Sequence, residues 1–172
     1  MIDLNEKRQA IIAVATEMFN KFVSMPPELR SDDKPRTGIK VLVWEPGTRN
    51  LILFSVAEPS EAAQFFVVEK AVRSHILSDM SSQNSEHEPS LQYMGSLSVF
   101  LDELEGRADK KGILLASTSG LKGEEDAAIS ASVLAEAADA SFQDICDNVA
   151  SNFGKLPFWY DSEDKSYFDF LF

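Results

Sequence analysis

The first pattern in the chain is a helical recurrence of apolar residues between about residues 4 and 22. Asp3 and Glu6 have the spacing of a capping box at its start. Pro26 and Pro27 end it, because proline cannot continue a helix. The apolar positions that share one helical face are Ile11, Val14, Ala15, Met18 and Phe22. These signals predict that the chain opens with a helix.

Two pairs of strands are predicted in the middle of the chain. Residues 39–45 and 51–57 are rich in β-branched and aromatic residues and flank the turn sequence PGTRN, which predicts a hairpin. Two further strands are predicted at about residues 93–101 and 112–118. The charged loop between them predicts a second hairpin.

Helices are predicted between and after these hairpins. Ser60 is a good N-cap for one helix, which fades near Asp79. Its apolar face is made by Phe65, Val68, Val72 and Ile76. An alanine-rich helix is predicted from residue 124 to about 138, with a break near Ser141 before the helix resumes through FQDICDNVA.

The predicted order is helix, two strands, helix, two strands, helix. This order is typical of an α+β fold in which an antiparallel sheet of two hairpins is flanked by helices. Residues 1–140 are predicted to form one domain, and residues 141–172 a C-terminal helical extension with an acidic, aromatic tail. With 44% hydrophobic residues the chain can build a real core.

Charge and cysteine content indicate which classes of partner and which cellular compartment to expect. The net charge is -12, and residues 123–154 contain acids but no lysine or arginine, so nucleic acid and anionic membranes are not expected as partners. No run approaches the roughly 20 apolar residues of a membrane helix. Cys146 is the single cysteine, which fits a reducing compartment and predicts a cytoplasmic protein.

The stretch STSGLKGEED raises the question of a phosphate-binding loop. A Walker-type loop needs a lysine directly after its last glycine, but Glu124 follows Gly123 here, and Glu125 and Asp126 add further negative charge. A regular helix also points these three acids in different directions, so they cannot share one metal ion. A strand, a loop and a helix start with Gly123 near the N-cap explain the stretch better.

This same stretch, GILLASTSGLKGEEDAAISASVLAEA, resembles the GlcG/HbpS-like family, which includes the C-terminal domain of PduO-type proteins. The segments VLVWEPGTRNLILFSVAE and SEAAQFFVVEKAVRSHILSDMSSQNS are also similar, and the order of elements matches over residues 3–138. The resemblance implies a profilin-like fold and assembly into a homo-oligomer. Some members of the family bind haem. The sequence departs from the family around FSVAEPSEAA and LQYMGSLSVF, which are pocket regions in that family.

Two groups of polar residues are candidates for binding a small molecule. His75 borders the apolar face of its helix, as a haem ligand would, although we favour a boundary histidine with one nitrogen in water. Ser117, Ser119 and Gly120 follow a buried-looking strand and could line a pocket at the sheet end, or simply bond to backbone. His87 lies in a polar loop and is expected to be solvated. No zinc site is predicted.

Two hypotheses about function follow. The first is a small-ligand-binding or accessory protein of the GlcG/HbpS-like type, with haem or another hydrophobic cofactor near His75. The second is an interaction protein that acts through its acidic helix face and the aromatic tail at residues 157–172. An enzyme ranks third, because Cys146 is expected to be a buried, inert thiol and no nucleophile with a base is legible.

Overall fold

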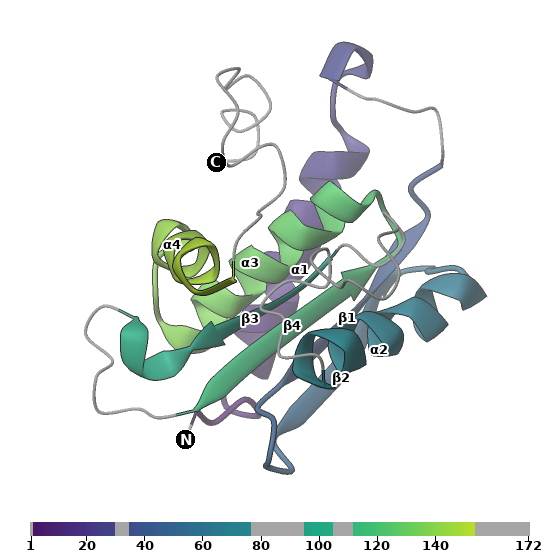
Figure 1. Cartoon of the computed structure of the whole chain (residues 1–172). Helices are drawn as coiled ribbons and strands as arrows, with labels where there is room; N and C mark the ends of the chain where they lie inside the picture. The colour runs from purple at the N-terminus through teal and green to yellow at the C-terminus, as the bar shows by residue number, and fades with distance from the viewer. Residues whose placement is uncertain (1, 30–34, 77–94, 105–111, 154–172) are drawn as a thin grey trace.

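The computed structural model of the chain describes residues 2–29, 35–76, 95–104 and 112–153. Within them, four strands form one antiparallel sheet in the order β2-β1-β4-β3 (Figure 1). The strands are β1 (Gly38–Trp44), β2 (Leu51–Ala57), β3 (Ser96–Phe100) and β4 (Ile113–Ser119). The helices are α1 (Arg8–Val23), α2 (Glu61–Ile76), α3 (Gly123–Ala138) and α4 (Phe142–Phe153), with short 3-10 turns η1 (Pro27–Leu29) and η4 (Leu101–Glu103). The predicted α+β fold is confirmed.

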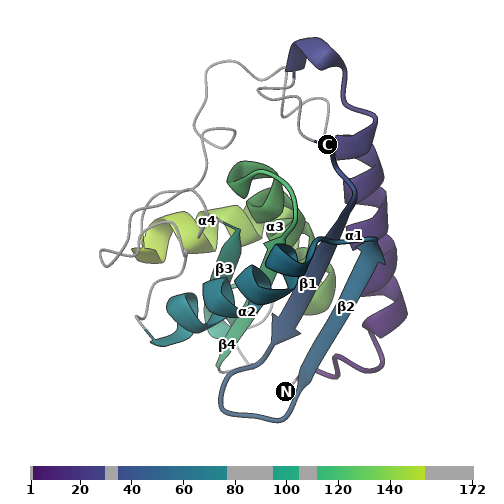
Figure 2. The same cartoon turned by 90° about the vertical axis from the view of Figure 1, so that its right-hand side faces the viewer.

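Helices cover both faces of the sheet (Figures 1 and 2). α1 and α3 pack against one face, and α4 lies against α3 and β3. α2 packs on the other face, mainly over β1, β3 and β4. In β1 the side chains alternate, so that Ile39, Val41 and Val43 join the large core under α1 and α3. Leu42 joins a much smaller core under α2, with Val67, Ala71 and Leu115.

α2 buries its small and polar side and exposes its large apolar side. An amphipathic helix ordinarily turns its apolar face toward the core. Here the buried residues are Ala63, Val67, Lys70, Ala71 and Ser74. The face predicted to be apolar points to solvent: Phe65 is 63% exposed, Val68 45%, Val72 39% and Ile76 69%. This orientation is the main feature of the fold that the spacing of apolar residues did not indicate.

Several predicted boundaries differ from the structure for local reasons. α1 begins at Arg8, not near residue 4. The Asp3 carboxylate accepts hydrogen bonds from the N–H groups of Asn5 and Glu6, as an N-cap does, but the N–H of Arg8 bonds to the carbonyl of Asn5, three residues back, which separates this first turn from the helix. α3 begins at Gly123, one residue before the predicted Glu124, and Gly123 lies next to the N-cap, Lys122. α4 resumes after Ser141 as predicted, and its core residues belong to the same cluster as those of α1 and α3.

Some predictions lie outside the described residues. They concern the end of the second predicted helix near Asp79, the polar loop that contains His87, the first residues of the strand predicted at 93–101, and the aromatic tail. The described part of that strand, β3, begins at Ser96, after Gly95, and ends where η4 begins at Leu101.

Candidate functional site

The residues at the end of β4 that were predicted to line a pocket have structural roles in this structure: they join the sheet to α2 and to the neighbouring strand. Ser117 is fully buried, and its hydroxyl donates a 2.7 Å hydrogen bond to the carbonyl of Val67 in α2. Ser119 is buried as well. Gly120 has a φ of 139°, and a Cβ there would lie 2.3 Å from the carbonyl oxygen of Gly38. Glycine is therefore needed where the chain leaves β4 so close to the start of β1.

His75 lies away from these residues, in the last turn of α2. Its ring is exposed and packs edge-on against Trp44, with ring centroids 4.9 Å apart. Val67, which accepts the bond from Ser117, precedes it by about 12 Å along the helix axis. The structure therefore does not bring His75 together with Ser117, Ser119 and Gly120. A haem or other cofactor at these residues stays a prediction.

A buried ion pair, which sequence reasoning missed, joins α2 to the start of α3. The Lys70 ammonium lies 2.8 Å from an Asp126 carboxylate oxygen and donates a second bond of 2.9 Å to the carbonyl of Thr118. The two side chains are only 3% and 2% exposed. The other Asp126 oxygen accepts from the N–H of Leu121 at 3.1 Å. Burial raises the pKa of the Asp126 carboxyl, and Lys70 opposes that rise.

A second buried pair, between Arg36 and Glu125, lies beside the first. The guanidinium donates from Nε to one carboxylate oxygen at 3.1 Å and from Nη2 to the other oxygen. Burial raises the pKa of the Glu125 carboxyl, while Arg36 lowers it. Glu125 also accepts from the N–H of Lys122, as the acid at the third helical position of a capping box does. The acids of GEED thus start the helix, as predicted, and two of them also anchor other elements.

Gly95 makes room for the pair between Lys70 and Asp126. Its φ is 125°, and a Cβ there would lie 2.7 Å from the Asp126 Cβ and 2.9 Å from the Lys70 ammonium. A sequence signal for this arrangement did exist. The small residues Ala63, Ala71 and Ser74 share one helical face with Lys70 and mark that face as the one that can approach a sheet closely. The acidic partner, however, is 56 positions away.

The ion pair determines which face of α2 meets solvent. Consecutive helical residues differ by about 100°, so Val68 and Val72, each two positions from Lys70, lie about 160° from it around the axis. Because Asp126 and Thr118 hold Lys70 inward, both valines point away from the sheet. Phe65 and Ile76 continue the same row. We call this surface, made by Phe65, Val68, Val72 and Ile76, the α2 stripe.

The edge strand β2 lies beside β1, at the margin of the sheet (Figure 2). Leu51 and Leu53 are 45% and 40% exposed and pair with Trp44 and Leu42 of β1, which contribute to the small core under α2. Paired residues of an antiparallel sheet place their side chains on one face. The two leucines stay exposed because α2 packs mainly over the other three strands.

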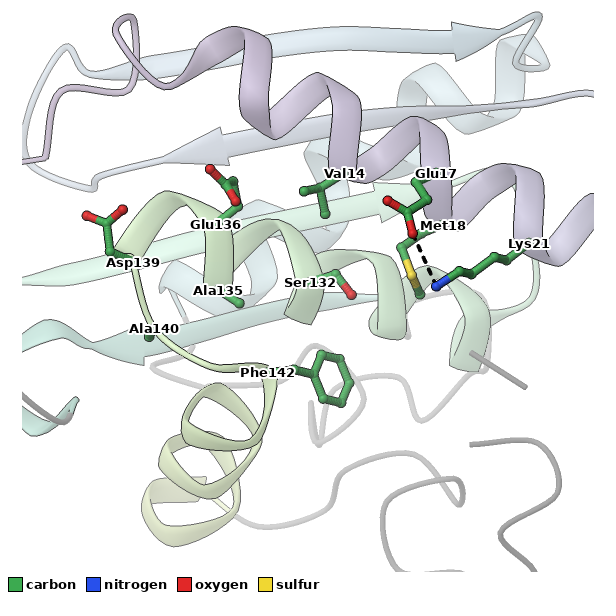
Figure 3. A pocket seen from close by; sticks show the side chains of 10 residues that line it. All are labelled: Val14, Glu17, Met18, Lys21, Ser132, Ala135, Glu136, Asp139, Ala140 and Phe142. Atoms are coloured by element: carbon green, nitrogen blue, oxygen red, sulfur yellow. Dashed lines mark ion pairs between the residues drawn. The ribbon is translucent and has the colours of Figure 1, made fainter. Parts of the chain in front are cut away.

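An open groove of about 330 Å³ lies on the other side of the sheet, between α1, α3 and the start of α4 (Figure 3). Met18, Ala135 and Phe142 give it apolar walls. Glu17 and Lys21, which form an exposed ion pair of 3.3 Å, stand at its rim. Its volume is within the range of small-molecule sites. Glu136 and Asp139 also line the groove, so its polar border carries three acids and one lysine.

The remaining sequence candidates have structural explanations. Cys146 is buried in α4 as predicted, and burial raises the pKa of its thiol, so it is a poor nucleophile. In the part of the chain that the structure describes, no three histidine, cysteine or acidic side chains are placed to hold a metal ion. Within the same residues, no helix is long and apolar enough to cross a membrane.

The exposed apolar surface of α2 and β2 and the groove between α1, α3 and α4 are the features of this structure that bear on function. The resemblance to the GlcG/HbpS-like family stays a prediction. No protein-family model, no curated protein and no solved structure matches this chain.

Proposed function

We propose that this protein is an interaction protein that binds a protein partner through the α2 stripe. The observation that carries the proposal is the exposure of four large apolar side chains on a helix whose opposite face is held inward by a buried ion pair. Contiguous exposed apolar patches mark interaction sites. The proposal keeps the interaction hypothesis of the sequence analysis but assigns it to α2, since the aromatic tail lies outside the described residues.

The free energy gained by covering this apolar surface sets a condition on the partner. The exposed fractions of the stripe, Leu51 and Leu53 together equal about three whole side chains. At about 1.5–3 kcal/mol for each apolar side chain that is fully buried, covering them contributes roughly 5–9 kcal/mol. Association itself costs about 4–15 kcal/mol in lost freedom. The partner must therefore bring apolar surface of its own.

Site-specific photo-crosslinking tests the proposal in the cells that make the protein. A photoreactive amino acid replaces Val68 on the stripe, and in a matched control it replaces Val23 of α1, which is 42% exposed against 45% for Val68. We expect protein adducts from position 68 and none from position 23. No adducts from position 68, or the same adducts from both positions, would overturn the proposal.

A second candidate function, binding of a small molecule, is supported by the groove between α1, α3 and α4. Native mass spectrometry of freshly purified protein should then show a retained small mass. Ala135→Trp, which fills the groove, should remove that mass. A retained mass that Ala135→Trp does not affect would place the ligand elsewhere. For haem, titration of His75→Ala is the direct test, and unchanged binding would remove His75 from the site.

A further inference from the structure

We infer that the partner of the α2 stripe is a second copy of this chain, docked so that the two α2 helices run antiparallel across a two-fold axis. The inference rests on the proposed function and names its partner. It requires a surface that is complementary to itself, because a two-fold contact uses the same patch on both copies. The α2 stripe meets that requirement in the sizes of its side chains, in their order along the helix and in the charges beside them.

The stripe is nearly palindromic. Its two end residues, Phe65 and Ile76, are large and 63% and 69% exposed, and its two central residues, Val68 and Val72, are smaller and 45% and 39% exposed. When the helix is reversed about its midpoint, Phe65 lies opposite Ile76 of the other copy, and Val68 opposite Val72. Small residues at the crossing point let two helix axes approach, and large ones on either side then pack around the contact. A parallel arrangement would stack phenylalanine on phenylalanine and lose this match.

The charges beside the stripe also favour the antiparallel arrangement. Glu61 lies in the first turn of α2, and Arg73 and His75 lie in its last turn. In this register His75 of one copy lies about 8 Å along the axis from Glu61 of the other, and the two helix dipoles oppose each other. Glu69 and Arg73 at the edge of the stripe form an ion pair of 3.4 Å within their own helix. Docking therefore does not have to bury a row of like charges, even though each copy carries -12.

A second copy also meets the energetic condition set above. It brings the same apolar stripe, so one contact covers two stripes at once, whereas a polar partner would cover only one. Leu51 and Leu53 of each copy lie on the same side of the sheet as α2 and extend the apolar surface at the margin of the contact.

Sedimentation equilibrium of the purified full chain tests whether the pair forms. We expect a reversible dimer whose dissociation constant rises by about 100-fold or more in Val72→Arg, since the change places two charges at the centre of a symmetric contact. The control Val23→Arg makes the same change at a valine of similar exposure on α1, and its constant should stay within about twofold of wild type. Both variants change the net charge of the chain by the same amount, so a loss in Val72→Arg alone cannot come from net charge. Circular dichroism verifies that each variant is folded.

Disulfide trapping tests the orientation. About the midpoint of the stripe, the two copies of residue 72 lie about 5 Å apart along the axis and the two copies of residue 65 about 16 Å apart. Val72→Cys should therefore form a cross-linked dimer, Phe65→Cys alone should not, and Phe65→Cys mixed with Ile76→Cys should. The natural Cys146 is buried and does not compete. A homodimer of Phe65→Cys would overturn the antiparallel arrangement.

The two proposals fail in different ways. A wild-type chain that stays monomeric at the highest soluble concentration, while position 68 still cross-links to a different protein in cells, overturns the second copy but leaves the interaction function standing. A monomer without any adduct from position 68 overturns both. A dimer that Val72→Arg does not weaken places the contact elsewhere and overturns the inference.

Discussion

Replacing Lys70 by methionine is expected to lower the free energy of unfolding by about 3–5 kcal/mol at neutral pH, because it leaves a buried charge without its partner. Methionine keeps most of the apolar length of the side chain, so the change leaves no large cavity. What is lost is the ammonium 2.8 Å from Asp126 and 2.9 Å from the Thr118 carbonyl. Asp126 is only 2% exposed and cannot turn to water instead.

The loss of stability in Lys70→Met should be largest at neutral pH and smaller in acid. Burial already raises the pKa of Asp126 above its ordinary 3.8, and without Lys70 the strongest opposition to the rise is gone, which leaves the hydrogen bonds from the backbone of Leu121 and Gly120. A carboxyl with a raised pKa in the folded state favours folding most when it is protonated, below its ordinary pKa. That contribution is lost as the pH rises through the folded value. Urea denaturation followed by circular dichroism, at one protein concentration and at several pH values, measures this, and the deficit of Lys70→Met should shrink toward acid.

Two further variants serve as controls for Lys70→Met. Lys21→Met removes the lysine of an exposed pair with Glu17 and should cost less than about 0.5 kcal/mol. Lys70→Met combined with Asp126→Leu removes both buried charges and should cost less than Lys70→Met alone. A cost for Lys70→Met no larger than that of Lys21→Met would refute the buried pair and, with it, the explanation of how α2 is oriented.

Gly95→Ala should cost about 2 kcal/mol or more, because the new Cβ strains a φ of 125° and meets Asp126 and the Lys70 ammonium; an unchanged thermal melt would contradict this. Glu125 also has a pKa raised above its ordinary 4.5, so its contribution to stability is complete below that pH and declines as the pH rises through the folded value. Glu125→Gln should therefore flatten the plot of melting temperature against pH in this range. A plot parallel to that of the wild type would argue against the burial of Glu125. Cys146 should react with Ellman's reagent only when urea unfolds the chain, and prompt reaction of the native protein would refute its burial.

Signals between neighbouring residues were sufficient to predict the first hairpin and the start of α2. The turn PGTRN, with Gly47 at a φ of 85°, predicted the first hairpin, and β2 occupies the predicted residues 51–57. The Ser60 hydroxyl accepts from the N–H of Ala63 at 3.2 Å and starts α2 where predicted. Such signals act between residues a few positions apart, and they carry over from sequence to structure. The position of β1 next to β4 did not follow from them, because it pairs residues 71–79 positions apart, such as Lys40 with Ser119 and Trp44 with Leu115.

The sequence by itself determined that α2 is a helix with a large apolar face and a small one, since that depends only on the spacing of residues along the chain. Only the tertiary structure decided which face is buried. Lys70 must meet Asp126, 56 positions away, and the carbonyl of Thr118 in β4, and both lie beneath the helix. An ammonium buried without these partners would be costly, so the pair holds the small face inward. Val68 and Val72 are then left in solvent, at the surface where we propose that a second copy binds.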